Sequence, residues 1–287
     1  MFWADWPYDY RARVPSFAHG LQILVHTNVI IAAAAAGVAV TTFVILREPI
    51  QPSLVIFAFA AAFLAYTLNR IWDHSVDTVN LPKRAALIDH YRSELIVFGF
   101  MVYAIGTMWI AQTSPRLAPF VIIPPIAAWV YSQTSVRERL LVKNVFAGVC
   151  WAGIPIGIGA TVGGLTASVT WITAIAIAWL ITTAAIIFDI KDILGDRGAG
   201  VHTFPIAYGV ARTRQFAIVS LLLLVPIIGL GALFVDPRLV LLLLYVGYLV
   251  VTIPFASETR DTLYYGLVID GEHIFVAIVA LSWVRLG

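Results

Sequence analysis

Charged residues are scarce in this chain, and their scarcity narrows the class of protein. Only 12% of the 287 residues are Asp, Glu, Lys or Arg, whereas about a quarter are charged in an ordinary soluble domain. Hydrophobic residues make up 61%, and a soluble fold with so few charges could not cover that much apolar surface. The composition therefore excludes an ordinary soluble protein and predicts a chain that is surrounded by lipid.

The chain also has a single cysteine and no large excess of charge of one sign. Because Cys150 is the only cysteine, an internal disulfide is excluded, and its apolar neighbours in the sequence are typical of buried packing. The formal net charge of +2 gives no reason to expect a nucleic-acid partner. Near the N-terminus no short apolar run leads to a small-residue cleavage site, so we expect no cleavable signal peptide.

Long apolar runs are what the chain has in place of charge. A helix needs about 20 mostly apolar residues to cross the hydrocarbon core of a membrane. The candidate spans are Leu21–Leu46, Ser53–Leu68, Leu95–Gln112, Leu117–Tyr131, Val145–Val162, Ser168–Phe188, Gln215–Val235, Leu239–Phe255 and Gly271–Val284. We predict an all-α fold, an integral membrane bundle of about nine transmembrane helices that forms a single domain over residues 1–287. Pro124 and Pro125 should kink the fourth span, because each removes a backbone donor.

The basic residues are shared unequally between the two sides of such a bundle. If the segments outside the spans are assigned alternately, 14 of the 18 Lys and Arg residues fall on the side of the N-terminus. The other side receives Arg47, Arg116, Arg238 and Arg285. Because basic residues accumulate in cytoplasmic loops, we predict a multi-pass protein of the cell membrane with a cytoplasmic N-terminus and an external C-terminus. The long connections, 69–94 and 189–214, then both form cap loops on the cytoplasmic side.

Each long connection opens with acidic residues at helical spacing. The two sets are Asn69, Asp73 and Asp77 in the first connection, and Asp189, Asp192 and Asp196 in the second. The first set is spaced i, i+4, i+8 and the second i, i+3, i+7, so each lies on one face if the preceding span continues as a helix. We therefore expect two helices that leave the membrane on the same side, each with a stripe of carboxylates.

A row of like charges destabilises a helix by a few tenths of a kcal/mol per i,i+4 pair, so something must offset it. Carboxylate and amide oxygens are ligands that Mg²⁺ accepts, and Mg²⁺ prefers to share its ligand shell with substrate phosphates. Cations are interleaved with these acids, namely Arg70, Lys83, Arg84, Lys191 and Arg197. Acids mixed with cations indicate a metal site that also holds a phosphorylated ligand. Solvated loop charge would explain one cluster alone, but two matched clusters favour the metal site.

At these residues the chain resembles the UbiA superfamily of intramembrane prenyltransferases. The set after the second span matches the N-x-x-x-D-x-x-x-D motif of that family, and the set after the sixth span matches its D-x-x-D-x-x-x-D motif. The segments GDRGAGVHTFPIAYG and YSQTSVRERLLVKNVFAG match two further parts of the family pattern. The resemblance covers nearly the whole chain. It departs in the first helix, where many members have an Arg and this chain has His26 and Asn28.

The resemblance implies Mg²⁺-dependent transfer of a prenyl chain from an allylic prenyl diphosphate to a lipophilic acceptor within the membrane. The partners are then the prenyl diphosphate, the acceptor and membrane lipid. The implied metal ligands are Asn69, Asp73, Asp77, Asp189, Asp192 and Asp196, of which the family makes Asp73, Asp77, Asp192 and Asp196 catalytic. The implied substrate-binding residues are Asn69, Arg70, Lys191, Tyr131, Arg137, Lys143 and Asn28.

Two other functions remain as alternatives. A terpene cyclase on the same scaffold would act on the prenyl diphosphate alone, with an alkene of the same chain attacking the allylic cation. A cation transporter is disfavoured, because transporters place charges near the bilayer midplane and these spans are almost free of acids. Asp270 and Glu272 stand at the start of the last span. We interpret them as caps of its N-terminus, and a contact with the acceptor is the alternative.

Overall fold

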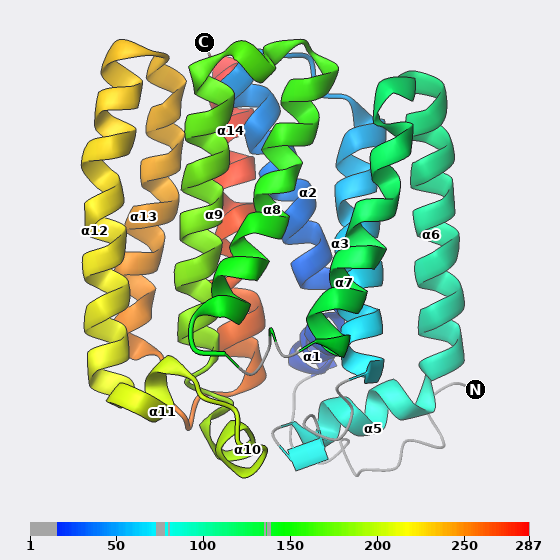
Figure 1. Cartoon of the computed structure of the whole chain (residues 1–287), viewed down its shortest axis with the longest axis vertical. Helices are drawn as coiled ribbons and strands as arrows, with labels where there is room; N and C mark the ends of the chain where they lie inside the picture. Colours follow the sequence, from blue (N-terminus) through cyan, green and yellow to red (C-terminus); the bar gives the residue numbers. More distant parts are fainter. Residues whose placement is uncertain (1–15, 73–77, 80, 135, 137–138, 287) are drawn as a thin grey trace.

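The computed structural model describes residues 16–72, 78–79, 81–134, 136 and 139–286, which form helices and turns without a β-strand. The helices of the first half are α1 (Ser16–His26), α2 (Val29–Leu46), α3 (Pro52–Trp72), α5 (Pro82–His90), α6 (Arg92–Thr113), η2 (Pro115–Ile122), α7 (Ile123–Gln133) and α8 (Val142–Thr161). Those of the second half are η4 (Gly164–Thr166), α9 (Ser168–Phe188), α10 (Ile193–Gly198), α11 (Phe204–Tyr208), α12 (Val210–Phe234), η5 (Pro237–Val240), α13 (Leu241–Thr252), η6 (Ile253–Phe255), η7 (Tyr264–Ile269) and α14 (Glu272–Leu286). The long helices run side by side in one bundle (Figure 1), so the predicted fold class is confirmed.

Eight helical segments in the described part of the chain are long and apolar enough to cross a membrane. They correspond to eight of the nine expected spans. The remaining one, Leu117–Tyr131, is formed by two shorter pieces, the 3₁₀-helix η2 and then α7. Pro119 lies inside η2 and Pro124 follows the first residue of α7, so backbone donors are missing along this segment. The predicted kink therefore takes the form of a change from 3₁₀ to α geometry.

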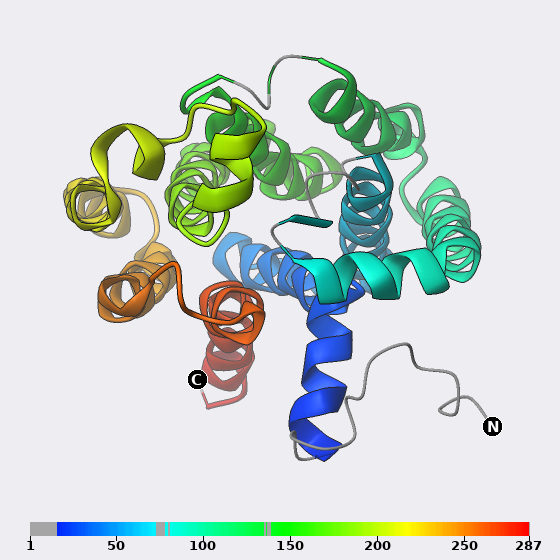
Figure 2. The same cartoon turned by 90° about the horizontal axis from the view of Figure 1, so that it is seen from below.

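The first expected span is not one continuous helix, and here the prediction is wrong. The chain breaks at Thr27 and Asn28 between α1 and α2, and Asn28 has φ 64° and ψ 12°. Asn is one of the few residues other than Gly that enters this left-handed region at low cost. In Figure 2, α1 extends outward from the bundle while α2 stays at its centre. The break brings the polar side chains of His26 and Asn28 to the inner end of α1.

The centre of the bundle is α2, which is the most buried of the long helices. It packs between α3 and α14, and its contact with α14 is close. A Cβ added at Gly37 would lie 2.6 Å from the backbone oxygen of His273, so only glycine allows this crossing. Around α2, buried side chains of α9, α12, α13 and α14 form much of the main apolar core, and Tyr245 and Tyr265 are its largest fully buried members.

The two ends of the bundle differ. The short helices α5, α10 and α11 lie at the end where α3 and α9 finish, whereas α14 finishes at the opposite end (Figure 1). The short connections α2–α3, α8–α9 and α12–α13 are also at that opposite end. The two long connections that carry the acidic sets therefore start at the same end of the bundle, in agreement with the sequence prediction. We call the end of the bundle where α3 and α9 finish the acidic end.

Candidate active site

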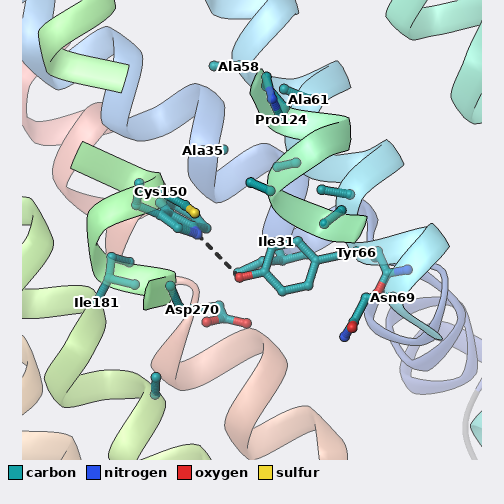
Figure 3. A pocket seen from close by; sticks show the side chains of 18 of the residues that line it. Ile31, Ala35, Ala58, Ala61, Tyr66, Asn69, Pro124, Cys150, Ile181 and Asp270 are labelled. Carbon is teal, nitrogen blue, oxygen red and sulfur yellow. Dashed lines mark hydrogen bonds between the residues drawn. The ribbon is translucent and has the colours of Figure 1, made fainter. Parts of the chain in front are cut away.

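A cavity of about 500 Å³ opens inside the bundle near the acidic end. Most of its wall is apolar and built from small side chains of α2, α3, α7 and α8, among them Ala35, Ala58 and Ala61. Polar side chains, including Asn69 and Asp270, gather toward one end of it (Figure 3). The cavity thus suits a molecule with a polar head and an apolar body.

The second acidic set does not lie on one helical face, so that prediction is wrong. Helix α9 ends at Phe188, the chain turns through Asp189 and Asp192, and α10 begins at Ile193. Carboxylates are unfavourable at the carboxyl end of a helix and favourable at the start of the next one. The turn nevertheless brings two of the three acids together, because Asp189 and Asp196 both contact the same lysine.

That lysine is Lys143, at the start of α8. Its Nζ donates to Asp189 Oδ1 at 2.9 Å and to Asp196 Oδ2 at 3.4 Å. Asn144 Nδ2 donates to the second oxygen of Asp189 at 3.1 Å. Both residues are buried, each with 6% of its surface exposed. Burial raises the pKa of Asp196 to about 6, and the charge of Lys143 only partly opposes this rise.

Asp192 is placed differently from the other two acids. One of its oxygens accepts a hydrogen bond from Lys191 Nζ at 2.5 Å. The other, Oδ1, is buried and has no hydrogen-bond partner among the described residues. Burial lowers the pKa of Lys191, and the charge of Asp192 opposes that change. A buried carboxylate oxygen without a donor is costly, and a metal ion at the edge of the cavity would satisfy it.

The first acidic set is only partly within the described chain. Asn69 lies near the end of α3, where its side-chain oxygen accepts a hydrogen bond from Ser132 Oγ at 2.8 Å. Asp73, Asp77 and the predicted phosphate contact Arg137 lie outside the described residues. Among the residues that are described, no three His, Cys, Asp or Glu side chains come together closely enough to hold a metal ion. The convergence of the two acidic sets stays a prediction.

The other candidates from the sequence reach the same cavity. Asn28 lines it from the break between α1 and α2, and its Nδ2 donates to Thr67 Oγ1 at 3.4 Å. The full set of sequence candidates that line it is Asn28, Asn69, Arg70, Tyr131, Lys143, Asp189, Lys191 and Asp192. Asp196 is joined to this set through Lys143. Helices α3, α7 and α8, the break before α2 and the turn after α9 thus bring polar groups to one cavity, and α10 adds Asp196 through its contact with Lys143.

A model of the UbiA prenyltransferase family matches residues 28–263 of the chain. The chain belongs to the UbiA prenyltransferase family. It is 27% identical over 175 residues to a digeranylgeranylglyceryl phosphate synthase of Natronomonas pharaonis, a match that covers 58% of this chain and 61% of that protein. It is 24% identical over 164 residues to the chloroplastic chlorophyll synthase of Arabidopsis thaliana, covering 53% of this chain and 42% of that one. The match thus spans less than two thirds of the length of these relatives.

The fold is also that of solved UbiA homologues. A structure of a UbiA homologue from Archaeoglobus fulgidus, bound to DMAPP and Mg²⁺, is 14% identical and has a TM-score of 0.65, with 90% of this chain and 98% of that chain covered. The apo structure of a UbiA homologue from Aeropyrum pernix is 16% identical, with a TM-score of 0.61 and coverage of 89% and 98%. At these identities the likeness establishes the shared fold.

Sequence reasoning did not place Tyr66 or Trp151 of this UbiA-family cavity in the site, and it gave a contact of Asp270 with the acceptor only as the alternative to a helix cap. Trp151 Nε1 donates to the hydroxyl oxygen of Tyr66 at 3.2 Å, and both side chains line the cavity. Tyr66 stands three residues before Asn69, so helical spacing could have placed it on the same face. Asp270 lines the cavity too. Its side chain makes no hydrogen bond or ion pair within the described chain, so the expected helix cap is absent.

Proposed function

We propose that this protein is a prenyltransferase that moves a prenyl chain from an allylic diphosphate to a lipophilic acceptor inside the membrane, with Mg²⁺ as its cofactor. The observation that carries the proposal is the division of the cavity. Carboxylates and cations, among them Asp192, Lys191 and Arg70, stand at one end of a space that is otherwise apolar. A prenyl diphosphate has the same division, with a charged head and a hydrocarbon tail.

The residues at the acidic end fit Mg²⁺ by chemistry. Asp192 offers a buried oxygen without a partner among the described residues, and carboxylates with few other ligands are what Mg²⁺ takes beside a phosphate. The proposed ligands remain Asn69, Asp73, Asp77, Asp189, Asp192 and Asp196. When bound, Mg²⁺ supplies positive charge that stabilises the diphosphate as it leaves. Relatives support this proposal, since homologue structures are bound to DMAPP or GPP together with Mg²⁺.

The cations of the site have distinct tasks in the proposal. Arg70 and Lys191 line the cavity and would hold the non-bridging oxygens of the diphosphate. Lys143 is already engaged by Asp189 and Asp196, so its main task is to hold those two acids together. Apolar walls keep water from the allylic cation, and the ring faces of Tyr66 and Trp151 can steady it.

The test of this function uses purified protein in detergent. We expect geranylgeranyl diphosphate and Mg²⁺ together, and neither alone, to raise the melting temperature, since a ligand at a hundredfold excess over its Kd stabilises by about 2.7 kcal/mol. Addition of membrane lipid should then yield a prenylated lipid that mass spectrometry detects. A cyclised hydrocarbon from the diphosphate alone would instead establish the cyclase, and no joint stabilisation would refute the shared site.

The charge distribution leads to a proposal on orientation, with the acidic end and the N-terminus in the cytoplasm and the C-terminus outside. We expect a reporter that is active only in the cytoplasm to work at the N-terminus and fail at the C-terminus. A second reporter, active only outside, should do the reverse, and testing both reporters at both ends provides the control. Activity of the same reporter at both ends would rule out an odd number of spans.

The raised pKa of Asp196 leads to a prediction on pH. Its pKa rises from 3.8 to about 6 in the folded protein, so without metal this group favours the folded state below about pH 4 and loses that effect as pH rises through about 6. Mg²⁺ needs the deprotonated carboxylate, so its affinity should fall as pH drops through about 6. Asp196→Asn should weaken Mg²⁺ binding and flatten this pH dependence in calorimetry. An unchanged pH profile in the variant would contradict the assignment.

A further inference from the structure

Asp270 is an acidic residue that faces the cavity from a part of the chain outside both acidic sets. Figure 3 shows its carboxylate pointing into the space beside Tyr66. In the part of the chain that the structure describes, this carboxylate makes no hydrogen bond or ion pair. The charges of Lys191 and Arg70 act on it through space. A carboxylate kept at membrane depth without a partner is costly and marks a functional position.

The backbone around Asp270 is built to hold it there. It follows the π-helix η7 (Tyr264–Ile269), and its N–H bonds to the carbonyl oxygen of Tyr265, five residues back, at 3.2 Å. Single π-turns in helical segments occur frequently at functional sites. A Cβ added at Gly271 would lie only 2.0 Å from the carbonyl oxygen of Leu267. The wide turn therefore depends on a glycine directly after the acid.

Hydroxyl and imidazole groups line this cavity as well as charged residues. His26 and Thr262, which hydrogen-bond at 3.0 Å, form the neighbouring wall of the cavity between α1 and η7. Across the cavity, the hydroxyl oxygen of Tyr66 accepts the Trp151 N–H, so the proton of Tyr66 is available to a bound molecule. A hydroxyl group placed between the two side chains would donate to Asp270 and accept from Tyr66.

We propose that Asp270 is a catalytic residue on the acceptor side, and that the acceptor is a lipid whose attacking group is a hydroxyl. This proposal rests on the prenyltransferase function proposed above. The bond between C1 of the prenyl chain and the diphosphate oxygen breaks, and its electron pair leaves with the diphosphate. The acceptor oxygen gives a lone pair to C1 and forms an ether. Its proton passes to the Asp270 carboxylate and from there to water.

Three variants test this assignment. Asp270→Asn keeps the size of the side chain but cannot take a proton, Asp270→Glu keeps the carboxylate, and Glu258→Gln removes an exposed acid outside the cavity as a matched control. Each is assayed with Mg²⁺, geranylgeranyl diphosphate and 1-O-octadecylglycerol as hydroxyl probe, with stearic acid as carboxylate probe. The joint melting-temperature rise with Mg²⁺ and the diphosphate serves as a separate measure of donor binding.

We expect the wild type to prenylate the alcohol, and Asp270→Asn to lose about 10²-fold or more of that rate while its joint melting-temperature rise is retained. Asp270→Glu should recover part of the rate, and Glu258→Gln all of it. Transfer by Asp270→Asn at the wild-type rate would overturn the catalytic assignment. A wild type that binds the donor but prenylates only the acid, or neither probe, would overturn the hydroxyl-lipid acceptor. A wild type without joint stabilisation would refute the proposed function instead.

Discussion

Asp192→Asn is expected to abolish prenyl transfer while the protein still folds. The substitution removes the charge from the one acidic side chain of the second set that has a buried oxygen without a partner among the described residues. The amide oxygen that replaces it can still accept the hydrogen bond from Lys191, so the local structure should hold. Removal of charge stabilisation from a leaving group typically costs a factor of about 10²–10³ in rate, and we expect a loss of at least that size.

The measurement is the initial rate of transfer at saturating Mg²⁺, accompanied by the joint melting-temperature rise with Mg²⁺ and geranylgeranyl diphosphate. Asp192→Asn should lose both. Glu94→Gln is the matched control, because Glu94 is an exposed acid at the start of α6, on the same end of the bundle and away from the cavity. A rate within about threefold of the wild type would remove Asp192 from the site. If Asp192→Asn loses the transfer rate but keeps the joint melting-temperature rise, Asp192 acts in the chemical step and is not needed for binding of Mg²⁺ and the diphosphate.

The spans can be predicted because a membrane helix depends on composition over about 20 residues, and composition is visible without any knowledge of packing. The predicted span Ser168–Phe188 coincides with α9 to the residue. The same reasoning fails wherever the backbone departs from regular helix. The break at Asn28 and the turn after Phe188 depend on which tertiary contacts the polar side chains find, and hydropathy does not contain those contacts.

In the candidate site, too, the sequence does not reveal the tertiary contacts between side chains. Asn69, Lys191 and Asp192, which the motifs group together, line one cavity, because each lies where a long helix ends. Motif spacing cannot show that Lys143 holds Asp189 and Asp196 together, since that contact joins residues 46 and 53 positions apart. For Asp270 the sequence favours a helix cap, because acids are common at helix N-termini. The π-helix before Asp270, which the sequence does not indicate, accompanies a side chain that faces the cavity and does not cap α14.

The depth of the cavity leads to a prediction on the donor. Gly153 and Gly157 line it from α8, one turn apart, and a Cβ added at either would meet nothing within 4 Å. Lys143 stands at the acidic end of the same helix, so Gly157 lies about 21 Å farther along it at 1.5 Å per residue. A leucine at Gly157 would project into space that only the far part of a long prenyl tail can occupy.

Gly157→Leu should therefore impair transfer of geranylgeranyl groups far more than transfer of geranyl groups. A tail that meets the leucine must bend or shift its head away from Asp192, and a misplacement of about 1 Å at the reacting atoms can cost about 10²-fold in rate. We expect the ratio of kcat/KM for geranylgeranyl over geranyl diphosphate to fall by at least about tenfold. Gly153→Leu, one turn nearer the acidic end, should impair shorter donors as well.

Gly229→Leu is the matched control for these variants. Gly229 is an exposed glycine of α12 where an added Cβ also meets nothing within 4 Å, and it is not part of the cavity wall. The same substitution there gains the helix propensity of leucine but should leave the donor ratio unchanged. If Gly157→Leu slows both donors equally, the tail does not extend along α8. The apolar wall formed by α3 and α7, with Ala58, Ala61 and Pro124 (Figure 3), would then be the place where donor length is limited.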